Sequence, residues 1–301
     1  MIKTHLPPVP SPTTTSSVAP IPTVIPGNEP IFQHVHGIGK RTLWVVTVAM
    51  GISSLVFYIL ATRAPISKRL FHILTSLITT ISFISYLAMA TGDGIAWSHI
   101  QIHESHKHVP DTKQDVFRQV FWFRYVNWIL TSPLILINLA LLGGLSGAHL
   151  LVAVSADLIM FGTGLLTSFA GNDGRKWAWF TISAIAYLVV VHQIGFNGGR
   201  AAANKDAQTK RFYGSIAGTS LVTLALYPII LAASTLSHRI SLDAEVVIWA
   251  VFDIVAQGIF GYWLLLTHDR SSSSFSLYLD GFWSRGVGQE GAIRVGEEDG
   301  A

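Results

Sequence analysis

Seven long apolar segments constrain the fold of this chain more than any other feature of its sequence. Each holds about 20 residues, the length that an α-helix needs to cross the hydrocarbon core of a bilayer. The segments are apolar on all sides and lack the alternation typical of a β-barrel. We therefore predict an all-α membrane protein, a bundle of seven transmembrane helices. The predicted spans are Thr42–Thr62, Leu70–Thr91, Phe117–Leu142, Ala148–Ala170, Trp177–Phe196, Tyr213–Leu236 and Ala244–Thr267.

The composition agrees with a membrane protein and excludes several other classes. Of 301 residues, 50% are hydrophobic and only 12% are charged, whereas about 25% are charged in a typical soluble domain. The chain has no cysteine, which excludes disulfides and cysteine-ligated metals. Its net charge of +3 is small and its basic residues are scattered, which argues against a nucleic-acid partner. The expected partner is the lipid bilayer.

Three regions follow from this pattern. Residues 1–41 are rich in Pro, Ser and Thr and predict a disordered tail. Residues 42–269 form the predicted transmembrane domain, and residues 270–301, rich in Ser and Gly, predict a second disordered tail. The connections are short except for the polar segment Gly92–Val116, so sequential helices should pack antiparallel. Basic residues near the helix ends are equally numerous on both sides, so the positive-inside rule does not orient the bundle.

Few ionisable residues lie within the predicted spans, and each is a candidate functional residue because burying a charge is costly. Arg124 and Asp253 are the natural ion pair, which would either serve a function or lock the third span to the seventh. We expect Asp157 to be neutral or hydrogen-bonded. Glu245 lies near a membrane surface.

The polar segment between the second and third spans contains four histidines. These residues, His99, His103, His106 and His108, could bind Zn²⁺ or Cu²⁺, and a helix would place His99 and His103 on one face. A solvated polar loop explains the same residues, and we favour it over a metal centre.

The third span carries a recognisable motif. Residues 124–134 read RYVNWILTSPL, which resembles the third-helix signature of microbial rhodopsins, Arg-Tyr-x-Asp-Trp-x-x-Thr-Thr-Pro-Leu. The other matching segments are Tyr86–Gly94, which is similar to the fungal branch, Ala156–Gly164, Tyr227–Pro228 and Asp253–Gly258. The resemblance covers all seven spans in order. It implies a rhodopsin-like bundle with its N-terminus outside and its C-terminus in the cytosol, in a fungal plasma membrane.

Departures from the family pattern affect the cofactor. Gln257 stands where the family has the lysine that binds retinal, and no predicted span contains a lysine. An amide cannot form a Schiff base because it has no nucleophilic amine. We therefore expect no covalent retinal, although retinal or a lipid could bind non-covalently. The residues expected to form a vestigial pocket are Tyr86, Trp128, Thr131, Trp179, Tyr227 and Asp253, together with Gln257.

Two further amides replace carboxylates of the family. Asn127 stands in place of the counterion and Asn138 in place of the proton donor, and amides do not relay protons as carboxylates do. Losing a lysine and an aspartate together keeps the interior neutral, so Asn127 and Gln257 could form a matched, hydrogen-bonded pair. Leu224 and Leu231 replace tryptophans of the family. Sequence drift with water filling the gap explains the same changes.

Three functions are consistent with these residues. Because chromophore lysine, counterion and donor are all absent, we favour a non-photochemical scaffold or stress-linked regulator of other membrane proteins. The resemblance to fungal opsin-related proteins suggests a proton ATPase as such a partner, and homo-oligomers are possible. The alternatives are a non-covalent retinoid- or lipid-binding module and a degenerate photoreceptor or ion transporter. Nothing predicts an enzyme.

Overall fold

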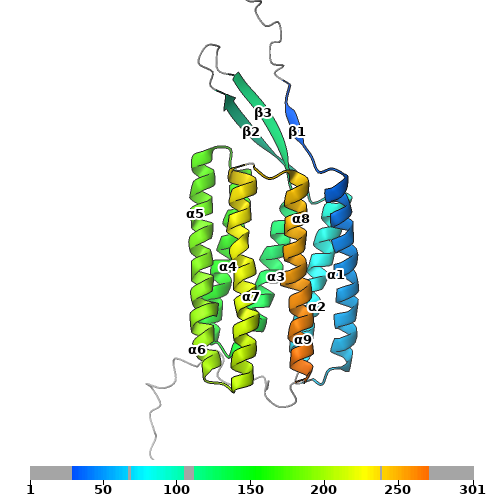
Figure 1. The fold of residues 1–301 in the computed structure, drawn as a ribbon, viewed down its shortest axis with the longest axis vertical. Coiled ribbons are helices and arrows are strands. Elements are labelled where there is room, and N and C mark those ends of the chain that lie inside the picture. The colour runs from blue at the N-terminus through cyan, green and yellow to red at the C-terminus, as the bar shows by residue number, and fades with distance from the viewer. Residues whose placement is uncertain (1–28, 67–68, 105–111, 238, 271–301) are drawn as a thin grey trace, which may run out of the picture.

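The computed structural model describes residues 29–66, 69–104, 112–237 and 239–270. Within them, seven helical spans are long and apolar enough to cross a membrane, and they form one bundle with a small sheet at one end (Figure 1). The predicted seven-helix fold is therefore confirmed. The predicted tails fall mostly outside the described residues, but α1 begins at Gly37, inside the segment expected to be disordered.

The spans follow the chain in order and are built from nine α-helices and three π-helical segments (η) among the described residues. These are α1 (Gly37–Arg63), α2 (Arg69–Thr91), α3 (Trp122–Gly143), α4 (Gly147–Phe169), α5 (Asp173–Val190), η1 (Val191–Asn197), α6 (Gly198–Ala203), α7 (Ala207–Leu231), η2 (Ala232–Leu236), α8 (Leu242–Asp253), η3 (Ile254–Ile259) and α9 (Phe260–Arg270).

The sheet occupies the segment that the sequence predicted to be a loop. β2 (Ala96–Glu104) pairs antiparallel with β3 (Thr112–Val120), and β1 (Ile31–Gln33) pairs parallel with β3. The third span consequently begins at Trp122 and not at Phe117, which lies in β3. Burial alternates along β3, with Val116 and Arg118 buried between more exposed neighbours, as expected for a strand with one covered face.

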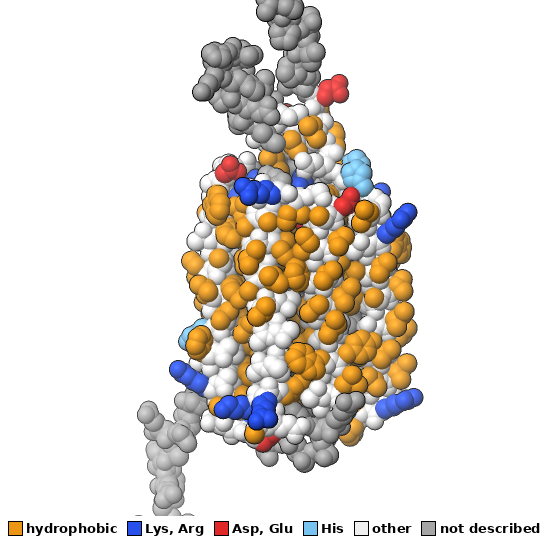
Figure 2. Space-filling view, viewed as in Figure 1, with side chains coloured by type: hydrophobic (Ala, Val, Ile, Leu, Met, Phe, Trp, Pro, Cys, Tyr) orange, Lys and Arg blue, Asp and Glu red, His pale blue; other side chains and the backbone are white. Residues whose placement is uncertain are grey.

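The outer surface of the bundle matches a bilayer. Figure 2 shows hydrophobic side chains over the middle of the molecule, with Lys and Arg side chains at its two ends. On α1, the exposed residues Val48, Ile52, Leu55 and Ile59 form a stripe with helical spacing. An apolar belt between two charged ends is the surface that lipid requires, so the chain is an integral membrane protein.

Local sequence fixes where the helices begin and end. Asp206 caps α7, accepting hydrogen bonds from the backbone N–H of Thr209 (2.9 Å) and from its hydroxyl (2.6 Å). These hydrogen bonds, the hydroxyl's first, hold the pKa of Asp206 below its ordinary value. At the end of α3, Gly144 has a φ of 72°, the left-handed conformation that commonly ends a helix.

The last span is not a continuous α-helix. Its central segment η3 is π-helical and contains Gln257. Such segments disturb the regular hydrogen-bond ladder and occur frequently at functional sites. The irregular backbone therefore marks the level of the bundle where the candidate site lies.

Candidate functional site

A small polar layer crosses the interior of the bundle at Gln257. The Gln257 amide nitrogen donates to the Thr131 hydroxyl at 3.1 Å, and its oxygen accepts from the Asn127 amide at 3.4 Å. The hydroxyl of Ser82 lies within hydrogen-bond distance of both Gln257 Oε1 and Asn127 Oδ1. All four side chains are almost fully buried. Each buried amide thus has partners, as burial requires.

Asp253 lies one turn before Gln257 and is held by neutral donors. The Tyr86 hydroxyl donates to its Oδ2 at 2.5 Å, and the Trp128 indole N–H donates to its Oδ1 at 2.7 Å. Both carboxylate oxygens are therefore hydrogen-bonded in a buried site, which offsets much of the cost of removing a carboxylate from water.

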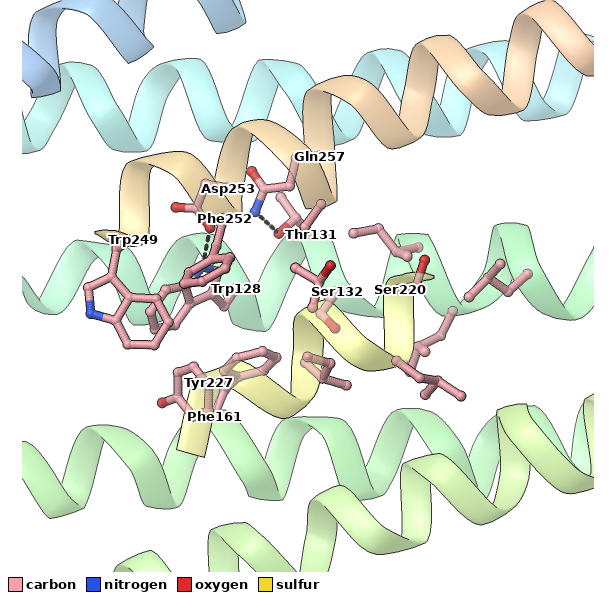
Figure 3. A pocket seen from close by; sticks show the side chains of 17 residues that line it. Trp128, Thr131, Ser132, Phe161, Ser220, Tyr227, Trp249, Phe252, Asp253 and Gln257 are labelled. Atoms are coloured by element: carbon pink, nitrogen blue, oxygen red, sulfur yellow. Dashed lines mark hydrogen bonds between the residues drawn. The ribbon is translucent and has the colours of Figure 1, made fainter. Parts of the chain in front are cut away.

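A cavity of about 80 Å³ adjoins this layer, between α3, α4, α7 and the last span. Its polar end is formed by Thr131, Asp253 and Gln257, and its remaining walls are mainly apolar (Figure 3). Trp128 is the centre of the aromatic wall, with ring-centroid distances of 4.7 Å to Trp249, 4.9 Å to Tyr227 and 5.5 Å to Phe161. The aromatic lining fits a flat, conjugated or otherwise apolar ligand.

Most of the pocket residues predicted from the sequence meet at this cavity. Trp128, Thr131, Tyr227, Asp253 and Gln257 line it. Leu224, at a position where the resemblance leads us to expect a tryptophan, also lines it, whereas Leu231 packs in the neighbouring aromatic cluster.

Two predicted residues lie elsewhere. Tyr86 does not line the cavity, but its hydroxyl donates a hydrogen bond to Asp253, which does. Trp179 is half-buried and does not line the cavity. Among the wall residues, the sequence analysis missed Trp249. Its position one helical turn before Asp253 was the available signal, because residues four apart share a helix face.

The expected ion pair between Arg124 and Asp253 is wrong. Arg124 Nη1 lies 3.4 Å from Glu245 Oε1, and Arg118 Nη2 lies 2.7 Å from Glu245 Oε2. Asp253 is instead satisfied by Tyr86 and Trp128. Glu245 is one turn into α8, at the end of the bundle that carries the sheet, where β3 brings Arg118 to it.

Asp157 and Asn138 are two further buried polar residues of the bundle. Ser132 donates to Asp157 Oδ1 at 2.7 Å, as expected for a hydrogen-bonded Asp157. Asn138 is fully buried, and neither its side-chain nitrogen nor its oxygen has a hydrogen-bond partner among the described residues. Internal water commonly satisfies such groups in proteins.

The loop histidines fall partly outside the described residues, as His106 and His108 do. His99 and His103 lie on β2, not on a helix. His99 is paired with Asp115, with 2.8 Å between Nε2 and Oδ1. In the described part of the chain, no three His, Cys, Asp or Glu side chains converge on a point where a metal could bind.

Comparison with known proteins identifies the family. The sequence profile described as "Bacteriorhodopsin-like protein" matches residues 39–271. This chain belongs to the bacteriorhodopsin-like family. "Opsin-1" of Neurospora crassa is 42% identical over 294 residues, covering 96% of each chain. "Opsin-like protein carO" of Fusarium fujikuroi is 28% identical over 230 residues, 76% of this chain and 73% of the relative.

Solved structures place light-driven pumps among the relatives of this bacteriorhodopsin-like protein. The light-driven proton pump LR (Mac) of Leptosphaeria maculans is 43% identical with a TM-score of 0.78, covering 80% of this chain and 98% of the pump. The light-driven proton pump of Coccomyxa subellipsoidea is 29% identical with a TM-score of 0.71, covering 79% and 100%.

These relatives overturn the function favoured by the sequence. From the sequence we predicted a non-photochemical scaffold or regulator, because three residues expected for the photochemical machinery are replaced. Relatives of 42–43% identity include a light-driven proton pump, and the comparisons point to photochemistry.

The walls of the site suit retinal in their chemistry, whereas its polar end does not suit a covalent attachment. The apolar and aromatic lining suits a polyene. Gln257 offers an amide, already hydrogen-bonded to Thr131, Asn127 and Ser82, and an amide does not capture an aldehyde. Among the described lysines, none lines the cavity.

Proposed function

We propose that this bacteriorhodopsin-like protein is a light-responsive retinal protein that holds its chromophore without a covalent bond. The observation that carries this proposal is the aromatic cavity that ends at Gln257 and Asp253. Retinal would lie against Trp128, Tyr227 and Trp249, and its aldehyde oxygen could accept a hydrogen bond only from the polar end. The site would bind and orient retinal and exclude water from it. When bound, retinal supplies the light absorption.

The experiment is a titration of the purified protein with all-trans-retinal in detergent. The expected result is a saturable absorption change with a stoichiometry near one, and competition by retinol, which has the same polyene but no aldehyde. Equal competition by a saturated fatty alcohol would show a general lipid site and would contradict a retinoid function. Absence of any saturable change would also contradict it.

Light-driven ion movement is the second candidate function. The relatives that carry "light-driven proton pump" in their names favour it. Asn127 and Asn138 carry amides, which do not exchange protons near neutral pH, so a proton would have to move through other groups such as Asp253. Vesicles loaded with a pH indicator, and separately with a chloride indicator, identify the ion. A flux that needs both light and retinal supports transport, and no flux of either ion contradicts it.

The location and orientation of the protein in the membrane, and its protein partners, stay predictions from the family resemblance. They comprise a plasma-membrane location, an external N-terminus and a cytosolic C-terminus. A proton ATPase partner and a homo-oligomer also belong here. Protease accessibility of each terminus in sealed cells tests the orientation, and crosslinking in native membranes tests the partners.

A further inference from the structure

A second pocket lies at the end of the bundle that carries the sheet, separate from the aromatic cavity. Three cationic side chains line it, namely Arg118 from β3, Arg124 from α3 and Lys176 from α5, and all three are buried. Of the carboxylates in the described part of the chain, Glu245 alone lines the same pocket. Buried cations in excess of buried carboxylates are costly unless an anion compensates them.

The existing contacts leave donors of two cations unused. Both terminal nitrogens of Arg118 have acceptors. Nη1 donates to Gln33 Oε1 at 3.0 Å, and Nη2 donates to the Ile240 carbonyl at 3.1 Å and to Glu245 at 2.7 Å. Arg124 reaches Glu245 at 3.4 Å, and its buried Nε has no hydrogen-bond partner among the described residues. The guanidinium of Arg124 therefore has a free donor inside the protein.

The charge of Lys176 is less well compensated by a carboxylate than the charge of Arg124 is. Its ammonium lies 3.7 Å from Asp173 Oδ1, too far for a hydrogen bond, and the Asp173 side chain is 89% exposed. Solvent screens such a carboxylate strongly. The Lys176 side chain itself is only 5% exposed. Asp173 therefore compensates the Lys176 charge only weakly.

The size of the pocket restricts that partner. Its volume is about 20 Å³, and a single water-sized particle needs about 10–15 Å³ by such a measure. A phosphate or an organic carboxylate does not fit. Among common anions, a monatomic one is closest in size to the single small particle that such a volume holds.

We propose that this pocket is a halide site, occupied by chloride and held by Arg124 and Lys176. The ion would neutralise a buried excess of positive charge and tie β3, α3 and α5 together. This site is independent of retinal, because its residues do not line the aromatic cavity.

The test uses the full chain in detergent without retinal. Its thermal midpoint is measured while sodium chloride replaces sodium gluconate at constant ionic strength. Chloride should raise the midpoint by about 3 °C in a saturable manner, because a ligand that binds only the folded state stabilises it. Lys176→Met should abolish the increase. Arg175→Gln, which removes the adjacent exposed cation, should keep it.

A second measurement covers the case in which Lys176→Met does not fold. Crystals of the unaltered protein grown in sodium bromide should show an anomalous scattering peak between Arg124 and Lys176. A water molecule there without an anomalous peak would overturn the proposal. So would a midpoint that does not respond to chloride, or an equal response in Lys176→Met.

Discussion

Glu245 lies within ion-pair distance of Arg124, 3.4 Å from oxygen to nitrogen, and the same carboxylate also accepts from Arg118. One acidic residue on α8 thereby joins the strand β3 and the helix α3. Among the described residues, no arginine lies within ion-pair range of Asp253, which is stabilised by Tyr86 and Trp128 instead. The charged contact and the cavity are therefore two separate sites.

Replacing Glu245 should cost more stability than replacing Asp253. Glu245→Gln removes the carboxylate that two buried guanidinium groups share, which should lower the free energy of unfolding by about 3 kcal/mol. Asp253→Asn keeps an acceptor for Trp128 and loses no ion pair, so its effect should be about 1 kcal/mol. Chemical unfolding in mixed micelles compares the two. A larger loss for Asp253→Asn would contradict the assignment of the ion pair.

The amides of Asn127 and Gln257 should be energetically coupled. Either Asn127→Leu or Gln257→Leu leaves a buried polar partner unsatisfied, at a cost of about 1–3 kcal/mol each. The double variant removes both amides, so it should be less destabilised than the sum of the two single variants. A double-mutant cycle on unfolding free energies measures this coupling. Strict additivity would show that the hydrogen bond contributes nothing.

Introducing an amine at the polar end of the cavity should permit covalent attachment. Gln257→Lys combined with Asn127→Asp supplies a nucleophile and a carboxylate beside it. After incubation with retinal and borohydride reduction, mass spectrometry should find a retinyl adduct on residue 257. The single variant Asn127→Asp is the control and should give none. Failure of the double variant to form an adduct would show that retinal does not reach this position.

Filling the cavity should weaken retinal binding. Ala256 lines the cavity, so Ala256→Phe should raise the dissociation constant for retinal by about tenfold or more, equivalent to about 1.4 kcal/mol. Ile259→Phe adds the same ring on the exposed face of the same segment and should leave binding unchanged. Equal effects of both variants would place the ligand elsewhere.

The sheet should lose a contact at acidic pH. Hydrogen bonds from His99 and Gln101 hold the pKa of Asp115 below its ordinary value. Its stabilising effect is therefore full above the unfolded pKa of about 3.9 and is lost as the pH falls through the lower folded value. Amide exchange in β2 and β3, corrected for intrinsic rates, should accelerate over that range. Asp115→Asn should remove this pH dependence, and an unchanged dependence in the variant would contradict it.

The bundle could be predicted from the sequence because each span is apolar over its whole length. The third span begins later than predicted because a non-local strand pairing intervenes. Phe117 looked like the start of a span, yet β3 needs it to pair with Phe32 of β1, far away in the sequence. Hydropathy carries no information about such a pairing.

The site was predictable in its members but not in its contacts. The third-helix motif pointed to Trp128 and Thr131, and both residues line the cavity. The motif could not reveal that Arg124 pairs with Glu245. At the end of the bundle that carries the sheet, β3 brings Arg118 to the same carboxylate. The predicted non-photochemical scaffold was wrong. It rested on three positions, Asn127, Asn138 and Gln257, whereas similarity to light-driven proton pumps extends over most of the chain.

The most direct test of the central claim compares retinal-loaded protein before and after denaturation. We predict a saturable absorption change in the folded protein, complete release of retinal on unfolding in detergent, and an intact mass equal to that of the bare polypeptide. A retinal adduct that survives denaturation and maps to any residue of the chain would contradict it.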